Sequence, residues 1–394
     1  MDVTVMAEQG GWIVTIVALV FWAGVLALRG GFWRAGPFLD DSPPDHPDWP
    51  GVVCVIPARN EAATIGGTVE SLLGQDYPGP VSVIVVDDNS DDGTGEAAKG
   101  AAGGAGRLTV LSGKPLEPGW SGKLWAVSQG LEAADEVDAD APYVLLTDAD
   151  ITHDEESLKR LVAKAEGENL DLVSLMVRLR CESGWEKLLI PAFIFFFQKL
   201  YPFSWVNDPA RKTAAAAGGC MLVRRSALLA SGGVEAIRGR LIDDCALAAQ
   251  IKARGPIWLG LTARVRSARA YDTLGPIWNM VARTAFEQLG NSVFALIATV
   301  IIMLVAYMAP LLAAFGVFGG GWVMTLGLVL WLGVMANAYI PTLRLYRLSV
   351  VWSVTLPLAA LLFILMTVSS AIRTWRGRGG GWKGRHYDTA SIGG

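Results

Sequence analysis

Long apolar stretches stand near both ends of the chain, and a mixed apolar and polar pattern lies between them. Residues 11–28 carry no charged side chain and are long enough to cross the roughly 30 Å hydrocarbon core of a bilayer as one helix. Residues 292–372 contain no acidic side chain, and a glycine cluster and a short arginine-containing segment divide them into three candidate spans, 292–316, 322–341 and 350–372. The pattern therefore predicts an N-terminal transmembrane anchor over 1–36 and about three transmembrane helices over 291–372.

The charges that flank the first apolar stretch indicate its orientation. Asp2 and Glu8 precede it and Arg29 and Arg34 follow it, which is not the basic start of a removable signal peptide. Because basic flanks stay on the cytoplasmic side, we expect the domain that follows to lie in the cytoplasm. Three further crossings would leave the basic tail, residues 373–394, outside, where its charges do not favour it. A re-entrant segment and an exception to the charge rule both remain open.

Short runs of Val, Ile and Leu alternate with helical patterns between residues 51 and 270. Four of these runs predict buried strands, at 52–56, 81–86, 108–111 and 143–146. Ile65, Val69 and Leu72 illustrate the helical pattern, since they fall on one face of a helix. Strands that alternate with helices predict an α/β fold with a mostly parallel sheet and a site at the carboxyl ends of its strands. We place this domain at 51–290, after a Pro- and Asp-rich linker at 37–50.

One apolar run inside this domain does not follow the alternation. Residues 185–206 contain LLIPAFIFFF, which is too short to span a bilayer and is bracketed by Lys187 and Lys199. Tryptophans at both ends, Trp185 and Trp205, and lysines that can extend to water are typical of a helix lying in the membrane interface. A buried core helix is the alternative.

The composition agrees with a protein that lies partly in the membrane. Of 394 residues, 52% are hydrophobic and 18% are charged, below the roughly 25% of a soluble domain. The net charge of -4 argues against a nucleic-acid-binding protein that relies on a positive surface. The four cysteines are far apart and form no C-x-x-C pair, so they predict neither a zinc cluster nor a disulfide framework.

Carboxylates follow two of the predicted strands. Asp87 and Asp88 end the run VIVVDD, where a carboxylate can accept hydrogen bonds from a base or a ribose, although such residues also suit a turn. Asp148 and Asp150 follow YVLLT, and carboxylates two residues apart on an extended segment can reach a divalent cation, Mg²⁺ or Mn²⁺. The position after a buried strand is what favours a site over a chance pattern.

Three further segments carry candidate chemistry, and each also has a plainer structural explanation. Asp243 and Asp244 open a helical pattern, where one can act as a general base or both can stabilise the helix N-terminus. Lys123 stands before a helix and suits a diphosphate, or it is a solvent-facing lysine. Gly218 and Gly219 precede a strand and allow close approach of a ligand, or they form a bend.

Taken in order, these segments resemble the membrane-bound family 2 glycosyltransferases, whose catalytic domain has the GT-A nucleotide-sugar (Rossmann-like) fold. The resemblance rests on VIPARNEAATI, VVDDNSDDGT, GKLWAVSQG, TDAD, GGCMLVRR and IDDCALA, and covers about residues 51–290. Within the family, the segments WSGKLWA, NDPARKTAAAAGGC, LIDDCALA and WKGRHY are most similar to the hopene-associated glycosyltransferases of bacterial hopanoid gene sets.

The resemblance implies a donor site for a nucleotide-sugar such as a UDP-sugar. In that site Asp88 would contact the base or the ribose. Pro57, Arg59 and Glu61 would lie at the edge of the nucleotide pocket, and Gly219 would lie on the sugar side.

The resemblance also implies the chemistry. Asp150 would ligate the metal directly, with Asp148 beside it on the ribose or on a metal-bound water. Asp244 would be the base that deprotonates the acceptor hydroxyl, paired with Asp243, so that attack on the anomeric carbon inverts its configuration. Lys123 and the metal would stabilise the charge that grows on the leaving diphosphate.

The sequence departs from the family pattern at two informative places. The base motif reads Ile-Asp-Asp where many relatives have Glu-Asp, so the role of Asp243 can differ from that of the glutamate in those relatives. The Gln-x-x-Arg-Trp signature of processive polymer synthases is absent, and Trp278 and Arg283 stand nearest to its place, with Arg283 on the donor side. We therefore expect transfer of a single sugar.

The expected activity is transfer of that sugar to a membrane lipid, hopanoid-related first, at the cytoplasmic face of the bacterial inner membrane. Polyprenyl phosphate is the alternative acceptor, and because it is already ionised it needs no strong base. A different alternative is a non-catalytic membrane protein that binds or assembles lipids with a degenerate transferase domain. A transporter is disfavoured, since the predicted spans carry no acid or base that would mark a translocation path.

Overall fold

In the computed structural model, which describes residues 3–39, 48–104, 106–379, 381–382 and 385–386, the chain divides into two compact units. The sheet unit comprises Gly36–Arg180, Trp205–Ala270 and Gly380–Gly394. The helical unit comprises Met1–Ala35, Cys181–Ser204 and Tyr271–Gly379, and α7 (Phe203–Val206) lies at the boundary between the two units. The predicted linker and tail fall only partly within the described residues.

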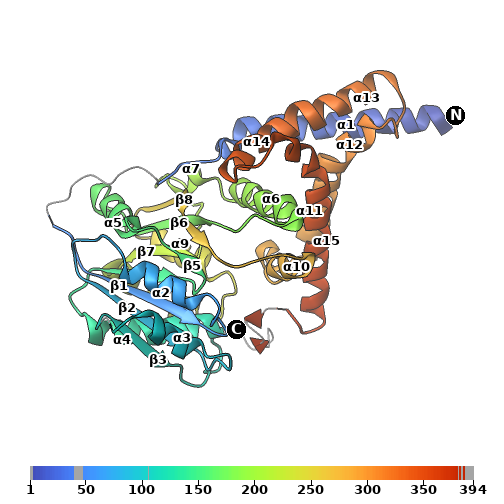
Figure 1. Ribbon diagram of the computed structural model, residues 1–394. Coiled ribbons are helices and arrows are strands. Elements are labelled where there is room, and N and C mark those ends of the chain that lie inside the picture. The colour runs from blue at the N-terminus through green and yellow to red at the C-terminus, as the bar shows by residue number, and fades with distance from the viewer. Residues whose placement is uncertain (1–2, 40–47, 105, 380, 383–384, 387–394) are drawn as a thin grey trace. The chain divides into compact units, whose positions relative to one another are not determined.

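Among the described residues, an eight-stranded mixed sheet forms the centre of the sheet unit (Figure 1). Its strands are β1 (Val52–Ala58), β2 (Val81–Asp87), β3 (Leu108–Ser112), β4 (Tyr143–Thr147), β5 (Ile151–Thr152), β6 (Leu172–Arg178), β7 (Cys220–Arg224) and β8 (Ile257–Ser267). Their order is β3-β2-β1-β4-β7-β6-β8-β5. The first four strands in this order are parallel, and β7 runs antiparallel between β4 and β6. The four predicted strands are these four, β6 and β8 form a further parallel pair, and the α/β fold class is confirmed.

Helices cover both faces of the parallel part, which explains why its strands read as continuous apolar runs. Val55 and Val86 meet α4 (Gly122–Val137), where Gly130 has no side chain and lets the helix approach. Cys54 and Val85 lie on the other face, in one core with α2 (Ile65–Leu73). The remaining helices of this unit are α3 (Thr94–Ala101), α5 (Ser157–Gly167), α8 (Arg225–Ala230), the 3₁₀ turn η2 (Glu235–Ile237) and α9 (Asp243–Lys252).

The helical unit contains four segments that are long and apolar enough to cross a membrane. They are Gln9–Leu28, Val293–Ala314, Gly321–Leu345 and Val350–Trp375, so the expected one N-terminal and three C-terminal candidate spans are confirmed. The elements of the unit are α1 (Val3–Leu28), η1 (Phe32–Arg34), α6 (Gly184–Leu200), α10 (Leu274–Ala282), η3 (Glu287–Leu289), α11 (Val293–Met303), η4 (Leu304–Met308), α12 (Ala309–Ala314), α13 (Gly321–Leu328), η5 (Val329–Met335), α14 (Ala336–Leu345), η6 (Val350–Thr355) and α15 (Leu356–Trp375). Two very short strands, β9 (Gly381–Trp382) and β10 (Arg385–His386), pair after α15.

Helix α6 packs among these apolar helices. The ring of Phe195 lies 5.4 Å from that of Tyr339 in α14, and the ring of Phe196 lies 5.1 Å from that of Phe363 in α15. The sequence pattern predicts that this segment is an interfacial helix of the sheet domain. In the structure it belongs to the helical unit, as do residues 271–290, because its aromatic side chains find their partners on α14 and α15.

Candidate active site

The loops that follow β1 and β2 are joined to each other. The backbone N–H of Asp88 donates to the carbonyl oxygen of Ala58 at 2.8 Å, and the Asp88 side chain is 1% exposed. The Arg59 guanidinium donates to the carbonyl oxygens of Asp88 and Asn89, at 3.2 Å for Asn89, and Nη1 lies 3.7 Å from Asp88 Oδ2. Arg59 therefore holds both loops at one edge of the sheet, next to buried Pro57.

Glu61 is fixed in the loop after β1 by neighbours from two other segments. Its backbone N–H donates to Thr94 Oγ1 at 2.9 Å, and its carboxylate accepts a hydrogen bond from Thr64 Oγ1 at 3.1 Å. The same carboxylate pairs with the guanidinium of Arg269, which follows β8. Glu61 is 8% exposed, so the carboxylate of this ion pair is largely buried.

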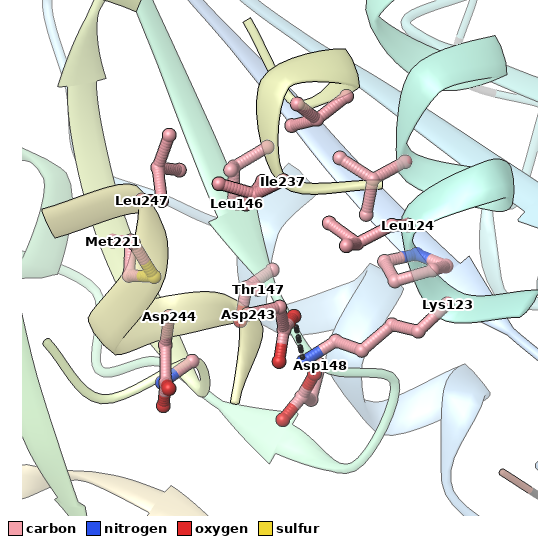
Figure 2. A pocket seen from close by; sticks show the side chains of 14 residues that line it. Lys123, Leu124, Leu146, Thr147, Asp148, Met221, Ile237, Asp243, Asp244 and Leu247 are labelled. Carbon is pink, nitrogen blue, oxygen red and sulfur yellow. Dashed lines mark hydrogen bonds and ion pairs between the residues drawn. The ribbon is translucent and has the colours of Figure 1, made fainter. Parts of the chain in front are cut away.

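Lys123 brings together the carboxylates that follow β4 and begin α9. Its Nζ lies 2.9 Å from Asp148 Oδ1 and 3.3 Å from Asp243 Oδ2 (Figure 2). Ser121 caps α4 by accepting from the N–H of Leu124 at 3.4 Å, and Lys123 stands in the first turn of that helix, where it lines the pocket described below. Segments that are far apart in the chain thus meet at one cation.

Burial and the charges of this cluster together hold the pKa values of Lys123 and Asp244 above their ordinary values. Burial alone would lower the pKa of Lys123, but the carboxylates of Asp148, Asp243 and Asp244 outweigh it and hold that pKa above its ordinary value. Burial raises the pKa of Asp244 to about 6, and the Asp243 carboxylate acts in the same direction. Lys123 and two backbone N–H donors, of Cys245 at 2.7 Å and Gly218 at 2.9 Å, oppose that rise. Three carboxylates around one ammonium leave an excess of negative charge.

Asp150 makes its contacts on the other side of the same turn. Its Oδ2 accepts hydrogen bonds from Ser267 Oγ and from Arg269 Nε, both at 2.9 Å, and the residue is 6% exposed. Asp148 and Asp150 supply the oxygen ligands that Mg²⁺ and Mn²⁺ prefer. No group of three or more His, Cys, Asp or Glu side chains in the described residues is arranged to hold a metal. A cation held by these two aspartates would take its remaining ligands from water or from another molecule.

The two glycines before β7 have different surroundings. A Cβ on Gly218 would lie 3.1 Å from Lys123 Nζ and 3.5 Å from Asp244 Oδ2, so the absence of a side chain gives these groups room. A Cβ on Gly219 would instead lie 3.1 Å from a methyl carbon of Val177 in the core. The glycine that borders the charged groups is therefore Gly218.

A pocket of about 360 Å³, open to solvent, has these charged groups among its lining. Its polar lining includes Lys123, Asp148, Asp243 and Asp244 (Figure 2). Pro57 and Gly218 also line it. The rest of the lining is mostly apolar and comes from α4, β4, β7, the η2 segment and α9; it is Leu124, Val127, Leu146, Thr147, Met221, Val234, Ile237 and Leu247. The structure thus gathers one cation and three carboxylates against an apolar wall.

The remaining candidates lie outside this lining. Arg59, Glu61 and Asp88 form the neighbouring edge after β1 and β2, and Asp150 contacts Arg269. Arg283 follows α10 in the helical unit and its side chain is exposed. Four further residues make hydrogen bonds beside the Asp148–Asp150 segment and the Gly218–Gly219 turn, and no sequence pattern indicates them. They are Thr147, His153, Ser267 and Arg269. A cation shortly after a strand is too common a pattern to have identified Arg269.

Comparisons with solved structures agree with this architecture. A mannosyltransferase from Pyrobaculum calidifontis, solved in complex with GDP-Man and Mn²⁺, is 19% identical and aligns with a TM-score of 0.59 over 94% of this chain and 99% of that chain. At this identity the likeness shows the fold. Mannosyl-3-phosphoglycerate synthase from Rubrobacter xylanophilus, at 18% identity, aligns over 61% of this chain and 74% of that chain with a TM-score of 0.40. Among curated proteins, none matches the sequence.

The mixed sheet, with carboxylates gathered at the ends of its parallel strands, has the Rossmann-like GT-A fold. More particularly, residues 53–230 match the family described as Glycosyl transferase family 2. The chain thus combines a segment that matches this family with four candidate membrane spans among the described residues.

Proposed function

We propose that this glycosyltransferase moves one sugar from a nucleotide-sugar, such as a UDP-sugar, to a hydroxyl group of a membrane lipid, with inversion at the anomeric carbon. The observation that carries the proposal is the convergence of Asp244, Lys123 and Asp148 on one pocket. A base, a cation for a leaving phosphate and a metal-type carboxylate are the groups that this reaction needs.

Asp244 is the proposed general base. Its raised pKa of about 6 leaves it ionised at neutral pH but more basic than an ordinary aspartate, which favours proton removal from a hydroxyl. Asp243, paired with Lys123, keeps the local charge negative and so supports that pKa. The deprotonated acceptor oxygen attacks the anomeric carbon as the bond to the diphosphate breaks.

The donor is proposed to lie along the edge of the parallel strands. Asp88 is placed for the base or ribose, with Pro57, Arg59 and Glu61 at that edge, and Gly219 and Arg283 remain proposals for the sugar and diphosphate side. Lys123 offsets the charge that grows on the leaving diphosphate. A divalent cation held by Asp148 and Asp150 would supply further charge stabilisation to the same phosphates.

The candidate membrane spans support the proposed class of acceptor. Four candidate spans imply that the protein works at a membrane, where an acceptor can keep its apolar body in lipid and present a hydroxyl group to water. We propose a hopanoid-related acceptor and the cytoplasmic face of a bacterial inner membrane, as the resemblance of the sequence and the basic flank of the first span suggest. Polyprenyl phosphate is the alternative acceptor.

The test is transfer of labelled sugar by the purified protein in lipid nanodiscs. UDP- and GDP-sugars are offered with Mg²⁺ or Mn²⁺ and extracted bacterial lipids, and Asp244→Asn and Asp150→Ala are assayed in parallel. We expect label in the lipid fraction with the wild type and a loss of about 10²- to 10⁴-fold in Asp244→Asn. Activity retained in Asp244→Asn indicates a phosphate acceptor, which needs no base. No transfer and no donor hydrolysis with any donor contradicts the proposal.

A further inference from the structure

A side-chain hydrogen bond spans β4 and β7 at the place where these strands separate. Thr147 is the last residue of β4 that pairs with β7, opposite Cys220. Beyond this pair one strand leads to Asp148 and the other comes from Gly218 and Gly219. The Thr147 hydroxyl donates to the carbonyl oxygen of Gly219 at 2.7 Å, so the connection continues one step past the last backbone pair.

His153 is the partner of that hydroxyl. Its Nε2 lies 3.1 Å from Thr147 Oγ1. A hydroxyl has one proton, and since Thr147 gives it to Gly219, Thr147 must accept from His153. Nε2 therefore carries the imidazole proton and Nδ1 is a bare acceptor, which has no hydrogen-bond partner among the described residues. His153 is 4% exposed, and burial lowers its pKa to about 4, so the ring is neutral.

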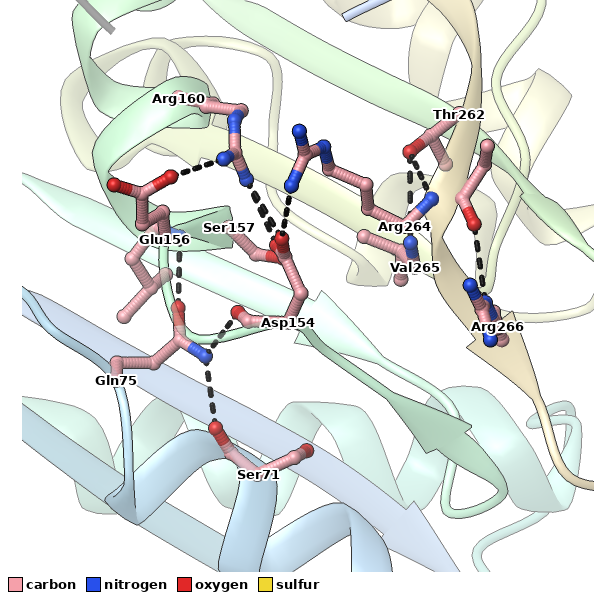
Figure 3. A network of polar contacts seen from close by, with 12 residues as sticks. Ser71, Gln75, Asp154, Glu156, Ser157, Arg160, Thr262, Arg264, Val265 and Arg266 are labelled. Atoms are coloured by element: carbon pink, nitrogen blue, oxygen red, sulfur yellow. Dashed lines mark hydrogen bonds and ion pairs between the residues drawn. The ribbon is translucent and has the colours of Figure 1, made fainter. Parts of the chain in front are cut away.

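The backbone of His153 is held independently of this bond. Its N–H donates to Ser71 Oγ at 3.1 Å, and the next residue, Asp154, has a carboxylate that accepts from Arg160 at 2.9 Å and Ser157 at 2.6 Å (Figure 3). Gln75 donates to the Asp154 carbonyl oxygen at 2.7 Å. The imidazole thus projects from a fixed segment, and replacing it leaves the segment's own bonds in place.

The far end of the chain of bonds reaches Asp244. Gly218 is joined directly to Gly219, and its N–H donates to Asp244 Oδ2 at 2.9 Å. That bond stabilises the ionised carboxylate, against the raising effects of burial and the Asp243 carboxylate, while Lys123 and the Cys245 N–H act with it. A shift of the Gly218–Gly219 turn would weaken the bond and displace the carboxylate.

We propose that His153 is a positioning residue, which through Thr147 and the Gly218–Gly219 turn fixes Asp244 relative to Asp148. The inference rests on the proposed function of this pocket, since it assigns the spacing of the proposed base and the proposed metal ligand to a residue that contacts neither. Nδ1 of this buried histidine has no hydrogen-bond partner among the described residues, and the hydrogen bond that Nε2 makes to Thr147 accounts for its place there.

The test uses the full-length protein in nanodiscs and compares His153→Phe, His153→Gln and Thr147→Val. His153→Phe removes the hydrogen-bond donor to Thr147. We expect kcat to fall about 10- to 100-fold with a smaller change in the KM for the nucleotide-sugar, because the base is displaced while the proposed nucleotide contacts after β1 and β2 stay. His153→Gln supplies an amide donor and should restore most of the rate. In the Thr147→Val background, His153→Phe should add little further loss, since both changes break one connection.

Two readouts do not depend on turnover. Imidazole nitrogen NMR on ¹⁵N-histidine-labelled protein, which has three histidines, should show the Nε2–H tautomer for the signal that His153→Gln removes. The pKa of Asp244, read from carboxylate infrared difference spectra against Asp244→Asn, should rise in His153→Phe. Absence of transfer in the wild type contradicts the proposed function but leaves both readouts measurable.

Thr68→Val is the matched control. Thr68 Oγ1 donates to the carbonyl oxygen of Ala149 at 2.9 Å, so this variant also loses a buried hydroxyl–carbonyl bond beside the Asp148 motif, but one that does not reach Gly219. It should lower thermal stability without moving the pKa of Asp244. The inference is overturned if His153 carries its proton on Nδ1, or if His153→Phe matches Thr68→Val in kcat and in the pKa of Asp244.

Discussion

The guanidinium of Arg269 lies against the carboxylate of Asp150, with 2.9 Å between Arg269 Nε and Asp150 Oδ2. Its other end pairs with Glu61. Arg269 thus joins the loop after β1 to the segment after β4, and it neutralises an aspartate that is 6% exposed. In this arrangement a side chain of the protein stands beside the oxygen that a divalent cation would need.

The first prediction concerns competition between Arg269 and a divalent cation for the carboxylate of Asp150. Arg269→Gln should bind Mn²⁺ about 3- to 10-fold more tightly than the wild type, a change of roughly 1 kcal/mol, because the cation no longer displaces a charged side chain. Removing one partner of a largely buried ion pair also destabilises the metal-free protein. Titration by electron paramagnetic resonance gives the affinity, and thermal unfolding with and without Mn²⁺ gives the stability, with a larger metal-induced rise in Tm for the variant.

Arg264→Gln is the control for this prediction. Arg264 lies on β8 close to Arg269 in sequence, is half exposed and pairs with Asp154 at 3.3 Å. Its replacement should leave Mn²⁺ affinity unchanged. Weaker Mn²⁺ binding in Arg269→Gln would show that Arg269 organises Asp150 for the metal rather than competing with it.

The parallel half of the fold could be predicted from the sequence for a physical reason. Strands β1, β2 and β4 are covered on both faces, so nearly every side chain must be apolar and each strand is a continuous run. The polar residues that end these runs, Asp88 and Asp148, are then conspicuous, and parallel strands bring their carboxyl ends to one edge. The four apolar spans were predictable because a bilayer sets their length.

The features that could not be predicted from the sequence depend on pairings between distant parts of the chain. Arg269 is 119 residues from Asp150, and no local pattern indicates which carboxylate it will meet. The antiparallel direction of β7 likewise follows from its neighbours β4 and β6. The apolar and aromatic run of α6 suits lipid, an interface or a protein core equally well, and no local pattern indicates that its rings will pack against Tyr339 and Phe363. The roles of Asp244 and Lys123 remain predictions.

A second prediction concerns Glu186, a fully buried carboxylate in the first turn of α6. Its two oxygens accept from the backbone N–H groups of Ser183 at 2.8 Å, Glu182 at 2.7 Å and Tyr271 at 2.7 Å. Glu186→Ala leaves these donors without their acceptor, and we expect a loss of about 2 to 4 kcal/mol in unfolding free energy. Thermal unfolding in detergent measures it.

Glu186→Gln tests the charge separately, since the amide keeps one acceptor oxygen but turns an N–H₂ group toward a donor. Its loss of stability should be clear but smaller than that of Glu186→Ala. Glu132→Gln, at an exposed position paired only with Lys114 at 3.0 Å, should change the Tm little. Equal stability of Glu186→Ala and the wild type is the result that contradicts the role assigned to Glu186.

The third prediction is the pH dependence of sugar transfer. A general base works in its ionised form, and burial raises the pKa of Asp244 to about 6. We therefore expect kcat to be at its plateau above that pKa and to fall as the pH drops through it. The Asp243 carboxylate raises that pKa and the Lys123 ammonium lowers it. Asp243→Asn should therefore move the acid limb to lower pH, and Lys123→Met should move it to higher pH.

The direction of the two shifts is the decisive measurement, because both variants are also expected to be slower. Rates at saturating donor and acceptor from pH 4.5 to 8 give the position of each limb independently of its height, on the scale where one pH unit is about 1.4 kcal/mol. Shifts of the same sign in both variants, or an acid limb that persists in Asp244→Glu at the unshifted position, would assign the titration to another group.

The last prediction separates the two adjacent glycines. Neither requires a left-handed backbone, so each Ala variant reports only on the space its Cβ enters. In Gly218→Ala the methyl meets the flexible end of Lys123 at 3.1 Å and the Asp244 carboxylate at 3.5 Å, which displaces the proposed catalytic groups and leaves the core intact. We expect kcat to fall about tenfold or more with little change in Tm.

In Gly219→Ala the methyl meets Val177 at 3.1 Å and Ile151 at 3.4 Å, both packed in the core of the sheet unit. Overpacking of this kind costs about 1 to 3 kcal/mol, so the Tm should fall first and any loss of kcat should be recovered at low temperature. Thermal unfolding and transfer rates for the two variants, measured in the same nanodiscs, make the comparison. If Gly218→Ala loses stability and Gly219→Ala loses only kcat, then Gly219 borders the reacting groups, and the assignment of Gly218 to that place is wrong.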